Sequence, residues 1–302
     1  PAKRARVMEV VRKLDYKPNQ TARSLASNRS QLIGVLLPDL MTPFFSEVLA
    51  NIESMCARNG YNIIVCNSQG NERKEQEAFA SLKARQVDGL LVGLTSPQSK
   101  LLSVLRKSSM HSVVITQDHP GIDCVGTSHA KGGELVARHF LENGVEKFLF
   151  LGPEHDEKLT GYRDALRTAG IPESQIEVLA VSDWFLHVSE QGYKAAKAYL
   201  GNLTGRSMKS GIFAVNDTFA FGAIHAAQDL RLAIPDTVSI VGFDNNYYCT
   251  SIRPLLTSVA QPTEDIGRIA VDMLLKRIDN SADSEQRVSI QLEPELIRRE
   301  TS

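Results

Sequence analysis

The sequence predicts an α/β fold of two successive units, each a parallel sheet with helices on both faces, preceded by a short helical head. Apolar runs typical of buried strands alternate with stretches of helical length, and short turns that often contain glycine separate them. The alternation pauses after about residue 115 and then restarts. A chain of 302 residues is long enough for two lobes.

The first 31 residues form a basic head. They carry eight basic and two acidic residues, a net charge of +6, which leaves 26 basic and 33 acidic residues, or −7, for the rest of the chain. This asymmetry indicates a polyanion partner, with DNA as the first candidate; a solvated helix and linker are the alternative. Residues 3–15 read as an amphipathic helix, and residues 18–31 as a short helix that needs a partner to fold.

The first lobe begins with the apolar run Leu32–Leu37, which ends at Pro38 and predicts a buried strand. In this lobe we expect strands at 32–37, 62–66, 87–92 and 112–115, and helices at 43–58, 72–85 and 101–107. In the second lobe we expect helices at 131–142, 158–169, 188–200 and 217–230, and strands at 147–151, 176–181, 211–215 and 238–242. A helix at 263–277 and one final strand at 288–298 complete the chain. In such folds ligands bind outside the carboxyl ends of the strands, so the cleft between the lobes is the expected site.

The composition is ordinary for a globular protein, with 42% hydrophobic and 23% charged residues. No apolar run has the length of a membrane span, and the basic start lacks the apolar core of a signal peptide. Four scattered cysteines form no C-x-x-C pair, which favours reduced thiols and a cytoplasmic protein. Because the chain starts at Pro1 without a methionine, we expect a fragment or a processed product.

Motifs of enzyme chemistry are absent. The sequence contains no Walker, dinucleotide-binding, zinc-protease or nucleophile-elbow pattern. The seven histidines show no metal spacing, and we expect His129, His155 and His187 to be surface or helix-capping residues. The prediction is therefore a protein that is not an enzyme and needs no cofactor and no metal.

A series of short motifs in a fixed order resembles the lactose/galactose repressor family of bacterial transcription regulators. The motifs are Tyr16-Lys17-Pro18-Asn19, Ala22-Arg23-Ser24-Leu25, Pro43-Phe44-Phe45, Gln86-Val87-Asp88-Gly89, Gly161-Tyr162-Arg163-Asp164, Asn216-Asp217, Val241-Gly242-Phe243-Asp244 and Pro254-Leu255-Leu256-Thr257. The resemblance covers essentially the whole chain. Residues 224–229 and 261–267 resemble most the catabolite control branch of the family.

The resemblance implies two periplasmic-binding-protein-like lobes behind a helix-turn-helix headpiece and a hinge helix. On this pattern residues 1–17 are the last headpiece helix and residues 18–31 the hinge, with the recognition helix expected upstream of Pro1. Residues 32–127 and 261–282 would form the N-terminal lobe, and residues 128–260 and 283–302 the C-terminal lobe.

The resemblance also implies a homodimer whose paired hinge helices lie in the minor groove of a DNA operator. Leu25 takes the position of the leucine that wedges into a base step, with Ala22 packed beside it; the alternative is a helix residue packed on the body. The expected DNA-binding residues are Tyr16, Asn19, Thr21, Ala22, Arg23, Leu25 and Arg29.

For the cleft, the resemblance implies a small carbohydrate-type effector. Aromatic contacts are expected from Phe44, Phe45 and Trp184, and polar contacts from Ser128, Lys131, Lys158, Asn216, Asp217, Asp244 and Gln261. One of the two phenylalanines can instead be core, Trp184 a surface residue and Asp217 a helix N-cap. Lys158 stands where relatives usually carry an arginine, and residues 127–133 lack the usual Asp-Asn. A less negative cleft favours an anionic effector such as a sugar phosphate; alternatively, Lys131 and Lys158 point to solvent.

The mechanism implied is allosteric: effector binding changes the lobe arrangement, and this pairs or separates the hinges. The catabolite control branch implies a phosphocarrier protein as a further partner, but Asn246-Tyr247-Tyr248-Cys249 departs from the usual sequence of that branch. A different class of protein, a solute-binding protein that delivers a sugar to a transporter, would share the lobes and the cleft. The basic head argues against this alternative.

Overall fold

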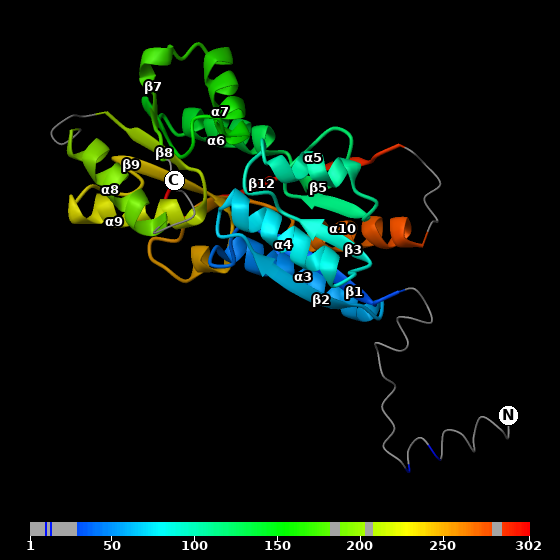
Figure 1. Ribbon diagram of the computed structural model, residues 1–302. Helices are drawn as coiled ribbons and strands as arrows, with labels where there is room; N and C mark the ends of the chain where they lie inside the picture. Colours follow the sequence, from blue (N-terminus) through cyan, green and yellow to red (C-terminus); the bar gives the residue numbers. More distant parts are fainter. Residues whose placement is uncertain (1–9, 11–12, 14–28, 182–187, 203–207, 280–285) are drawn as a thin grey trace.

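The protein consists of two α/β lobes, drawn side by side in Figure 1. The computed structural model describes residues 10, 13, 29–181, 188–202, 208–279 and 286–302. Within these ranges no helix combines the length and the apolar character needed to cross a membrane. The predicted helix at 3–15 and hinge helix at 18–31 lie almost wholly outside the described residues.

The N-lobe contains a six-stranded sheet in the order β11-β5-β4-β3-β1-β2, with all its strands parallel. Its strands are β1 (Leu32–Leu37), β2 (Asn62–Asn67), β3 (Gly89–Val92), β4 (Ser112–Ile115), β5 (Asp123–Thr127) and β11 (Ser289–Leu292). Its helices are α3 (Pro43–Arg58), α4 (Glu72–Ala84), α5 (Lys100–Lys107) and α10 (Thr263–Ile278). Strand β1 is buried over nearly its whole length, as its continuous apolar run predicts.

The C-lobe contains a second six-stranded sheet in the order β12-β10-β9-β8-β6-β7, in which only β12 is antiparallel. Its strands are β6 (Lys147–Leu151), β7 (Ile176–Leu179), β8 (Ser210–Ala214), β9 (Val238–Asp244), β10 (Thr257–Ala260) and β12 (Glu295–Ile297). Its helices are α6 (His129–Glu142), α7 (Glu157–Thr168), α8 (Val188–Gly201) and α9 (Asp217–Asp229), with short 3₁₀ turns η1 (Glu173–Gln175) and η2 (Tyr247–Thr250).

The chain passes between the lobes three times. It leaves the N-lobe after β5, returns between β10 and α10, and leaves again between β11 and β12. The single final strand predicted at 288–298 is therefore wrong, since β11 and β12 belong to different sheets. Pro294 lies between them, and a proline has no N–H for a strand ladder and favours an interruption.

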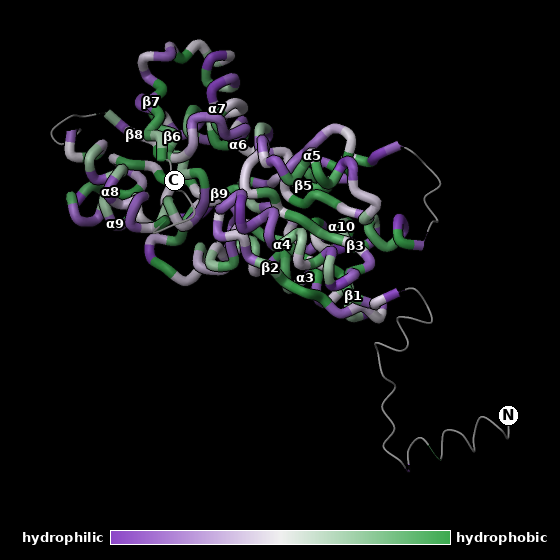
Figure 2. The backbone as a smooth tube through the Cα atoms, viewed as in Figure 1, coloured by the Kyte–Doolittle hydropathy of each residue, from purple (hydrophilic) through white to green (hydrophobic). Residues whose placement is uncertain are grey.

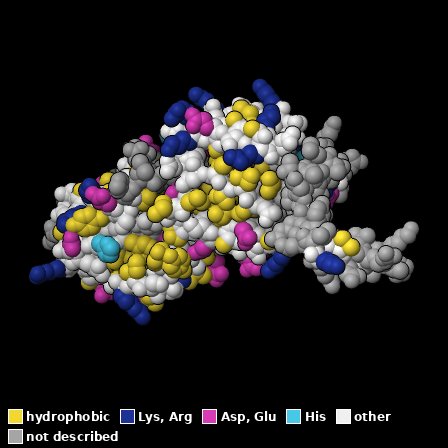
Figure 3. Space-filling model, turned by 60° about the horizontal axis from the view of Figure 1, so that its bottom comes forward, with side chains coloured by type: hydrophobic (Ala, Val, Ile, Leu, Met, Phe, Trp, Pro, Cys, Tyr) yellow, Lys and Arg dark blue, Asp and Glu magenta, His cyan; other side chains and the backbone are white. Residues whose placement is uncertain are grey.

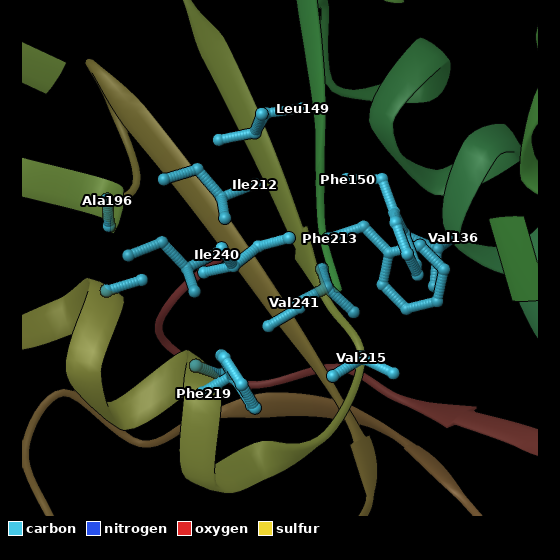
Figure 4. Close-up of a cluster of buried hydrophobic side chains, with 14 of the residues drawn as sticks. Val136, Leu149, Phe150, Ala196, Ile212, Phe213, Val215, Phe219, Ile240 and Val241 are labelled. Carbon is cyan, nitrogen blue, oxygen red and sulfur yellow. The ribbon is translucent and has the colours of Figure 1, made fainter. Parts of the chain in front are cut away.

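Each lobe has its own apolar core. Figure 2 shows hydrophobic segments concentrated along the strands and the inner sides of the helices. The C-lobe core centres on Phe213, Ile240 and Val241, which lie between α6 on one side and α8 and α9 on the other (Figure 4). The N-lobe has two clusters, one with α3 and α10 and one with α4 and α5. The two lobes are therefore packed around separate cores.

Glycines let pairs of helices in the C-lobe approach closely. A Cβ placed on Gly133 of α6 would lie 2.0 Å from the carbonyl oxygen of Lys158 on α7. A Cβ on Gly161 of α7 would lie 1.8 Å from the carbonyl oxygen of Ala130. Real Cβ atoms do not approach oxygen so closely, so this helix crossing requires glycine at both positions.

Candidate effector cleft between the lobes

A cleft of about 290 Å³ lies where the carboxyl ends of both sheets face each other. The N-lobe lines it with the start of α3 and with the loops after β3 and β4. The C-lobe lines it with the starts of α6 and α7 and with the ends of β8 and β9. This is the position at which α/β sheets bind ligands. The predicted location of the site therefore agrees with the fold.

Two phenylalanines form the aromatic wall on the N-lobe side. Phe44 and Phe45 both line the cleft, and their rings meet edge to face with centroids 5.2 Å apart. They follow Pro43 at the start of α3, where the absent N–H costs nothing because a first-turn N–H has no intrahelical acceptor. Asp39 fixes the approach to the helix by accepting the N–H groups of Met41 and Thr42 at 2.9 and 3.0 Å. The wall offers an apolar face to a flat or ring-shaped ligand.

Lys158 and His129 stand on the opposite wall, and both contact the aromatic ring of Phe243. The Lys158 Nζ atom lies 4.6 Å from the Phe243 ring centroid and 3.6 Å from Asp156 Oδ2. His129 meets the same ring edge to face, with centroids 5.6 Å apart. Burial, helped by the neighbouring Lys158 charge, lowers the pKa of His129 to about 4. His129 is therefore neutral at pH 7 and can both donate and accept a hydrogen bond.

A buried polar pair forms the floor of the cleft. Gln261 Nε2 donates to Asp244 Oδ1 at 2.7 Å, and both residues are 8% exposed. Burial and the nearby charge of Asp217 hold the pKa of Asp244 well above its usual range, so the carboxyl favours its protonated form. Within the described residues no hydrogen bond of normal geometry reaches Gln261 Oε1, although the Gln261 side chain lies close enough to His129 to influence the pKa of its ring. A buried acceptor that borders a cleft is suited to a ligand hydroxyl, because leaving it unpaired is costly.

Asp217 lies behind this floor and does not line the cleft. Its carboxylate accepts the hydroxyl of Ser258 and, at 2.8 Å, the N–H of Asn246, and its side chain is fully buried. Burial raises the pKa of Asp217 to about 7 despite these hydrogen bonds. Asn216 is the N-cap of α9 instead, since its side chain accepts the N–H of Phe219 at 3.0 Å. Asp217 thus connects the start of α9 to the segment after β9.

We expect the buried Asp217 carboxyl to make the protein less stable as pH rises. Its pKa is about 7 in the folded chain and about 4 in the unfolded chain, so the fold binds the proton more tightly between these values. The free energy of unfolding should fall from pH 4 to pH 7 by up to about 4 kcal/mol from this group. Urea unfolding of Asp217→Asn and of the wild type measures this effect. The variant should have the higher free energy of unfolding at pH 7, and the two values should approach each other at pH 4. A pH-independent difference would contradict this assignment.

The structure brings Phe44, Phe45, Lys158, Asn216, Asp244 and Gln261 together in the cleft. It does not bring Ser128 and Lys131 there: both line a groove between α6 and α7, and Lys131 Nζ lies 2.9 Å from Glu134 Oε2. The cleft therefore has Lys158 as the only lysine or arginine among its described lining residues, beside Asp118, Asp156 and Glu157. Trp184 lies outside the described residues.

Several lining residues were not among the predicted ones. They are Thr95 and Gln98 after β3, Gln117 and His119 after β4, and His129, Pro153, His155 and Asp156 at the C-lobe helix starts. His129 and His155 were expected only as surface or capping residues. The available signal was position: each of these polar side chains follows a predicted strand or opens a predicted helix.

On the DNA side, six of the seven predicted residues, from Tyr16 to Leu25, lie outside the described residues. Arg29 is described, and the structure pairs it with the end of α10. Its Nη1 atom lies 2.7 Å from Asp279 Oδ1, and its Nη2 atom donates to the carbonyl of Ile278 at 3.2 Å. Arg29 therefore anchors the entry of the chain into the N-lobe.

Comparison with known proteins agrees with this architecture. Residues 137–302 match the family model described as a periplasmic binding protein-like domain. The chain is 31% identical to the HTH-type transcriptional regulator RegA of Clostridium saccharobutylicum over 98% of this chain and 89% of that protein. It is 31% identical to the repressor PurR of Aliivibrio fischeri strain ES114, over 99% of this chain and 89% of that protein. It is also 31% identical to catabolite control protein A of Priestia megaterium, over 91% of this chain and 83% of that protein.

Solved structures give the same picture. A LacI family transcriptional regulator from Enterococcus faecium, solved with bound ribose, superposes with a TM-score of 0.76 at 27% identity, over 90% of this chain and 98% of that one. The transcription regulator GntR from Chromobacterium violaceum superposes with a TM-score of 0.78 at 28% identity, over 90% and 99% of the two chains.

Proposed function

Because this chain belongs to the LacI family of transcription regulators, we propose that it is a DNA-binding regulator, acting as a repressor of carbohydrate-utilisation genes, whose operator affinity depends on a small molecule held between its lobes. The observation that carries the proposal is the cleft itself. It combines an aromatic wall, the buried pair of the Gln261 amide and the Asp244 carboxyl, and a neutral histidine at the junction of two lobes. A basic head of net charge +6 supplies the polyanion-binding end.

The charges in the cleft favour a neutral, polyhydroxylated effector over an anionic one. The expectation of a sugar phosphate required Lys131 and Lys158 in one site, and the two residues line different surfaces. Lys158 is already opposed by Asp156 and stacked on Phe243. Burial lowers the pKa of both His119 and His129, which keeps these rings neutral at pH 7. A phosphate group in the cleft would therefore lie near several carboxylates. The only lysine or arginine among the described lining residues is Lys158, which Asp156 already pairs.

A thermal-shift panel of neutral sugars and their phosphates tests the effector class. A ligand at about 100 times its dissociation constant should add roughly 2.7 kcal/mol to the free energy of unfolding. We expect a shift with a neutral pentose or hexose. If only the sugar phosphates raise the unfolding temperature, the effector is anionic and the assignment to a neutral sugar is wrong. If no sugar or phosphate binds while another solute does, the carbohydrate assignment fails.

We also propose that the regulator is a homodimer, formed through the face that bears α3, β2 and the segment after β9. Strand β2 is an edge of its sheet, and Val65 on it is 37% exposed. Met41, Tyr247 and Tyr248 are exposed hydrophobic residues, and the two tyrosine rings lie 4.0 Å apart. Figure 3 shows hydrophobic side chains gathered over two areas of the lower side of Figure 1. An apolar edge of this kind is usually covered by a partner.

A lysine at Val65 should weaken the dimer. The substitution would place a charge in the apolar interface, and we expect the dissociation constant to rise by at least about tenfold, equivalent to about 1.4 kcal/mol. Analytical ultracentrifugation measures the change. The matched control is Val104→Lys on α5, a residue of similar exposure on a different surface, which should leave the dimer unchanged. Equal dimerisation of the two variants would rule out this face.

The alternative function, a solute-binding protein for a transporter, shares the two lobes. Two observations favour the regulator: transcription regulators match nearly the whole chain, and the chain begins with a basic head. Salt-dependent retention of the complete protein on duplex DNA would support regulation, because phosphate contacts release counterions. Effector binding without any DNA binding would favour the transporter role.

A further inference from the structure

The N-lobe has one end that faces away from the cleft, and the fold directs several helix C-termini to it. Helices α3, α4 and α5 each connect two parallel strands, so they run against the strands and end at the amino edge of the sheet. Helix α10 ends there as well, since Arg29, just before β1, contacts Ile278 and Asp279. This end is called the N-lobe pole below.

The helices that end at the N-lobe pole all finish with basic residues. The last turns carry Arg58 on α3, Lys83 on α4, Arg106 and Lys107 on α5, and Lys276 and Arg277 on α10, and Arg85 caps α4. Five of them, Arg58, Lys83, Arg85, Arg106 and Lys107, are exposed. Within the described part of the chain, no ion pair joins these five side chains to a carboxylate.

The carboxylates at this pole are already engaged. Asp88 accepts the backbone N–H groups of Ser30 and Gln31 at 2.7 and 2.9 Å. Asp279 pairs with Arg29, and the buried Asp123 accepts two hydrogen bonds from Arg277 at 2.8 and 2.9 Å. The exposed cations therefore give the pole an excess of positive charge that these acids do not cancel.

The C-lobe provides an internal comparison, because it has the same architecture. Basic residues near a helix C-terminus interact favourably with the helix dipole, and this effect should apply equally to both lobes. Yet α8 and α9 have no basic residue in the last turn, and α9 ends at Asp229. Helix α6 has only His139 there, and burial lowers the pKa of this ring. Arg167 of α7 pairs with Glu173 at 3.0 Å. The helix dipole alone does not account for the bias toward basic residues in the N-lobe.

A small pocket of about 180 Å³ at the N-lobe pole collects part of this charge. Arg106, His111 and Arg287 line it. Arg106 is held in place by the carbonyl of Pro120, to which its Nη2 atom donates at 2.6 Å. Arg287 lies 3.5 Å from Asp123, which is already bound bidentately by Arg277. Burial, followed by the charges of Arg287 and Arg277, lowers the pKa of His111, as expected in a positive local field.

The pole also lies where the basic head joins the lobe. Strand β1 starts at Leu32, directly after the head of net charge +6, and its first residues lie at this amino edge. In Figure 1 the chain enters the N-lobe at the end away from the C-lobe. A polyanion bound by the head would pass close to the pole.

We propose that the N-lobe pole is a second DNA-contacting surface, which binds backbone phosphates next to the operator through Arg106, Lys107 and the neighbouring basic helix ends. This inference rests on the proposed DNA-binding function and extends it from the head to the lobe. The contacts would be to phosphates and independent of base sequence, since exposed lysines and arginines at helix ends present charge without a rigid geometry for base edges. They would add affinity and salt dependence without changing which operator is chosen.

The test is the salt dependence of DNA binding by the complete regulator with its DNA-binding head. The variant is Arg106→Gln with Lys107→Gln, and the matched control is Lys147→Gln with Arg231→Gln at the corresponding end of the C-lobe. The probe is a duplex that carries an operator selected from random sequences and extends beyond it on both sides. Unchanged thermal unfolding and effector binding establish that both variants are folded.

We expect the pole variant to bind this duplex about tenfold more weakly at moderate salt. The slope of log affinity against log salt should decrease in magnitude by about 1 to 2, at about 0.9 for each lost phosphate contact, while the control matches the wild type. If the wild type binds DNA and the pole variant keeps its affinity and slope, the inference is overturned and the proposed function stands. If the wild type binds no duplex at any salt, the proposed function itself fails. Tight binding of tripolyphosphate that the variant loses, with an unchanged DNA slope, would make the pole a small-anion site instead.

Discussion

Replacing Gln261 by leucine should weaken effector binding by about 100-fold, or about 2.7 kcal/mol. Gln261 lies at the crossover between β10 and α10, where its amide borders the cleft and touches Asp244. Leucine keeps the approximate size but removes the Oε1 acceptor at the cleft and the Nε2 donor to Asp244. A site built to bind hydroxyl groups loses most when a buried polar partner disappears. Calorimetry with the effector found in the sugar panel measures the change.

The matched control is Gln76→Leu on the exposed side of α4, which applies the same chemical change away from the cleft. It should bind the effector as the wild type does. The Gln261→Leu protein should remain folded, because the raised pKa of Asp244 shifts its carboxyl toward the neutral form, which costs less to leave without the amide donor than a full charge does. If a folded Gln261→Leu protein bound the effector with wild-type affinity, the Gln261–Asp244 pair would not be part of the effector site.

The second large effect concerns stability, at the crossing of α6 and α7. Gly133→Ala should lower the free energy of unfolding by about 3 kcal/mol. The new Cβ would lie 2.0 Å from the Lys158 carbonyl oxygen and 2.8 Å from the Tyr162 nitrogen, which are backbone atoms that cannot rotate away. Alanine gains about 1 kcal/mol in helix propensity, too little to offset this clash. Because Lys158 also lines the cleft, separating the helices should weaken effector binding as well.

Gly201→Ala serves as the control for this prediction. Gly201 is the last residue of α8, and a Cβ there would meet no atom within 4 Å. The free energy of unfolding of this variant should stay within about 1 kcal/mol of the wild-type value, because only the difference in helix propensity between glycine and alanine contributes. Urea unfolding compares the two proteins. Equal stabilities would show that the helix crossing adapts to a methyl group.

The sequence was sufficient for the order and type of most elements. The apolar run Leu32–Leu37 and the helix that opens at Pro43 begin and end where their patterns predict. Both signals are local: a buried parallel strand is apolar throughout, and proline fits the first turn of a helix. The α/β class and the resemblance to the lactose/galactose repressor family are confirmed by the fold and by the relatives.

Strands next to the interlobe passages were harder to predict. The strands β5 and β10 were not predicted, although they are no shorter than β3 and β4, which were predicted. The final strand was predicted as one piece, although its halves pair with β5 and β10 in different sheets. Strand pairing across such separations in sequence leaves no local pattern to read.

The candidate site was predicted in part for the same reason. Phe44, Lys158 and Gln261 occur at positions that family motifs mark, and the structure places them along one cleft. Lys131 is two residues into α6 and turns to Glu134 instead, a choice between helix faces that the sequence left open. His119 and His155 carry no motif and reach the cleft only because their strands end there.

The most direct test of the account is the operator affinity of the complete regulator with and without the identified effector. If cleft occupancy controls DNA binding, saturating effector should change this affinity by about 5- to 150-fold, and the operator should change effector affinity by the same factor. The Gln261→Leu protein should need about 100-fold more effector for the same change. An effector that binds the cleft tightly and leaves operator affinity unchanged would contradict the central claim.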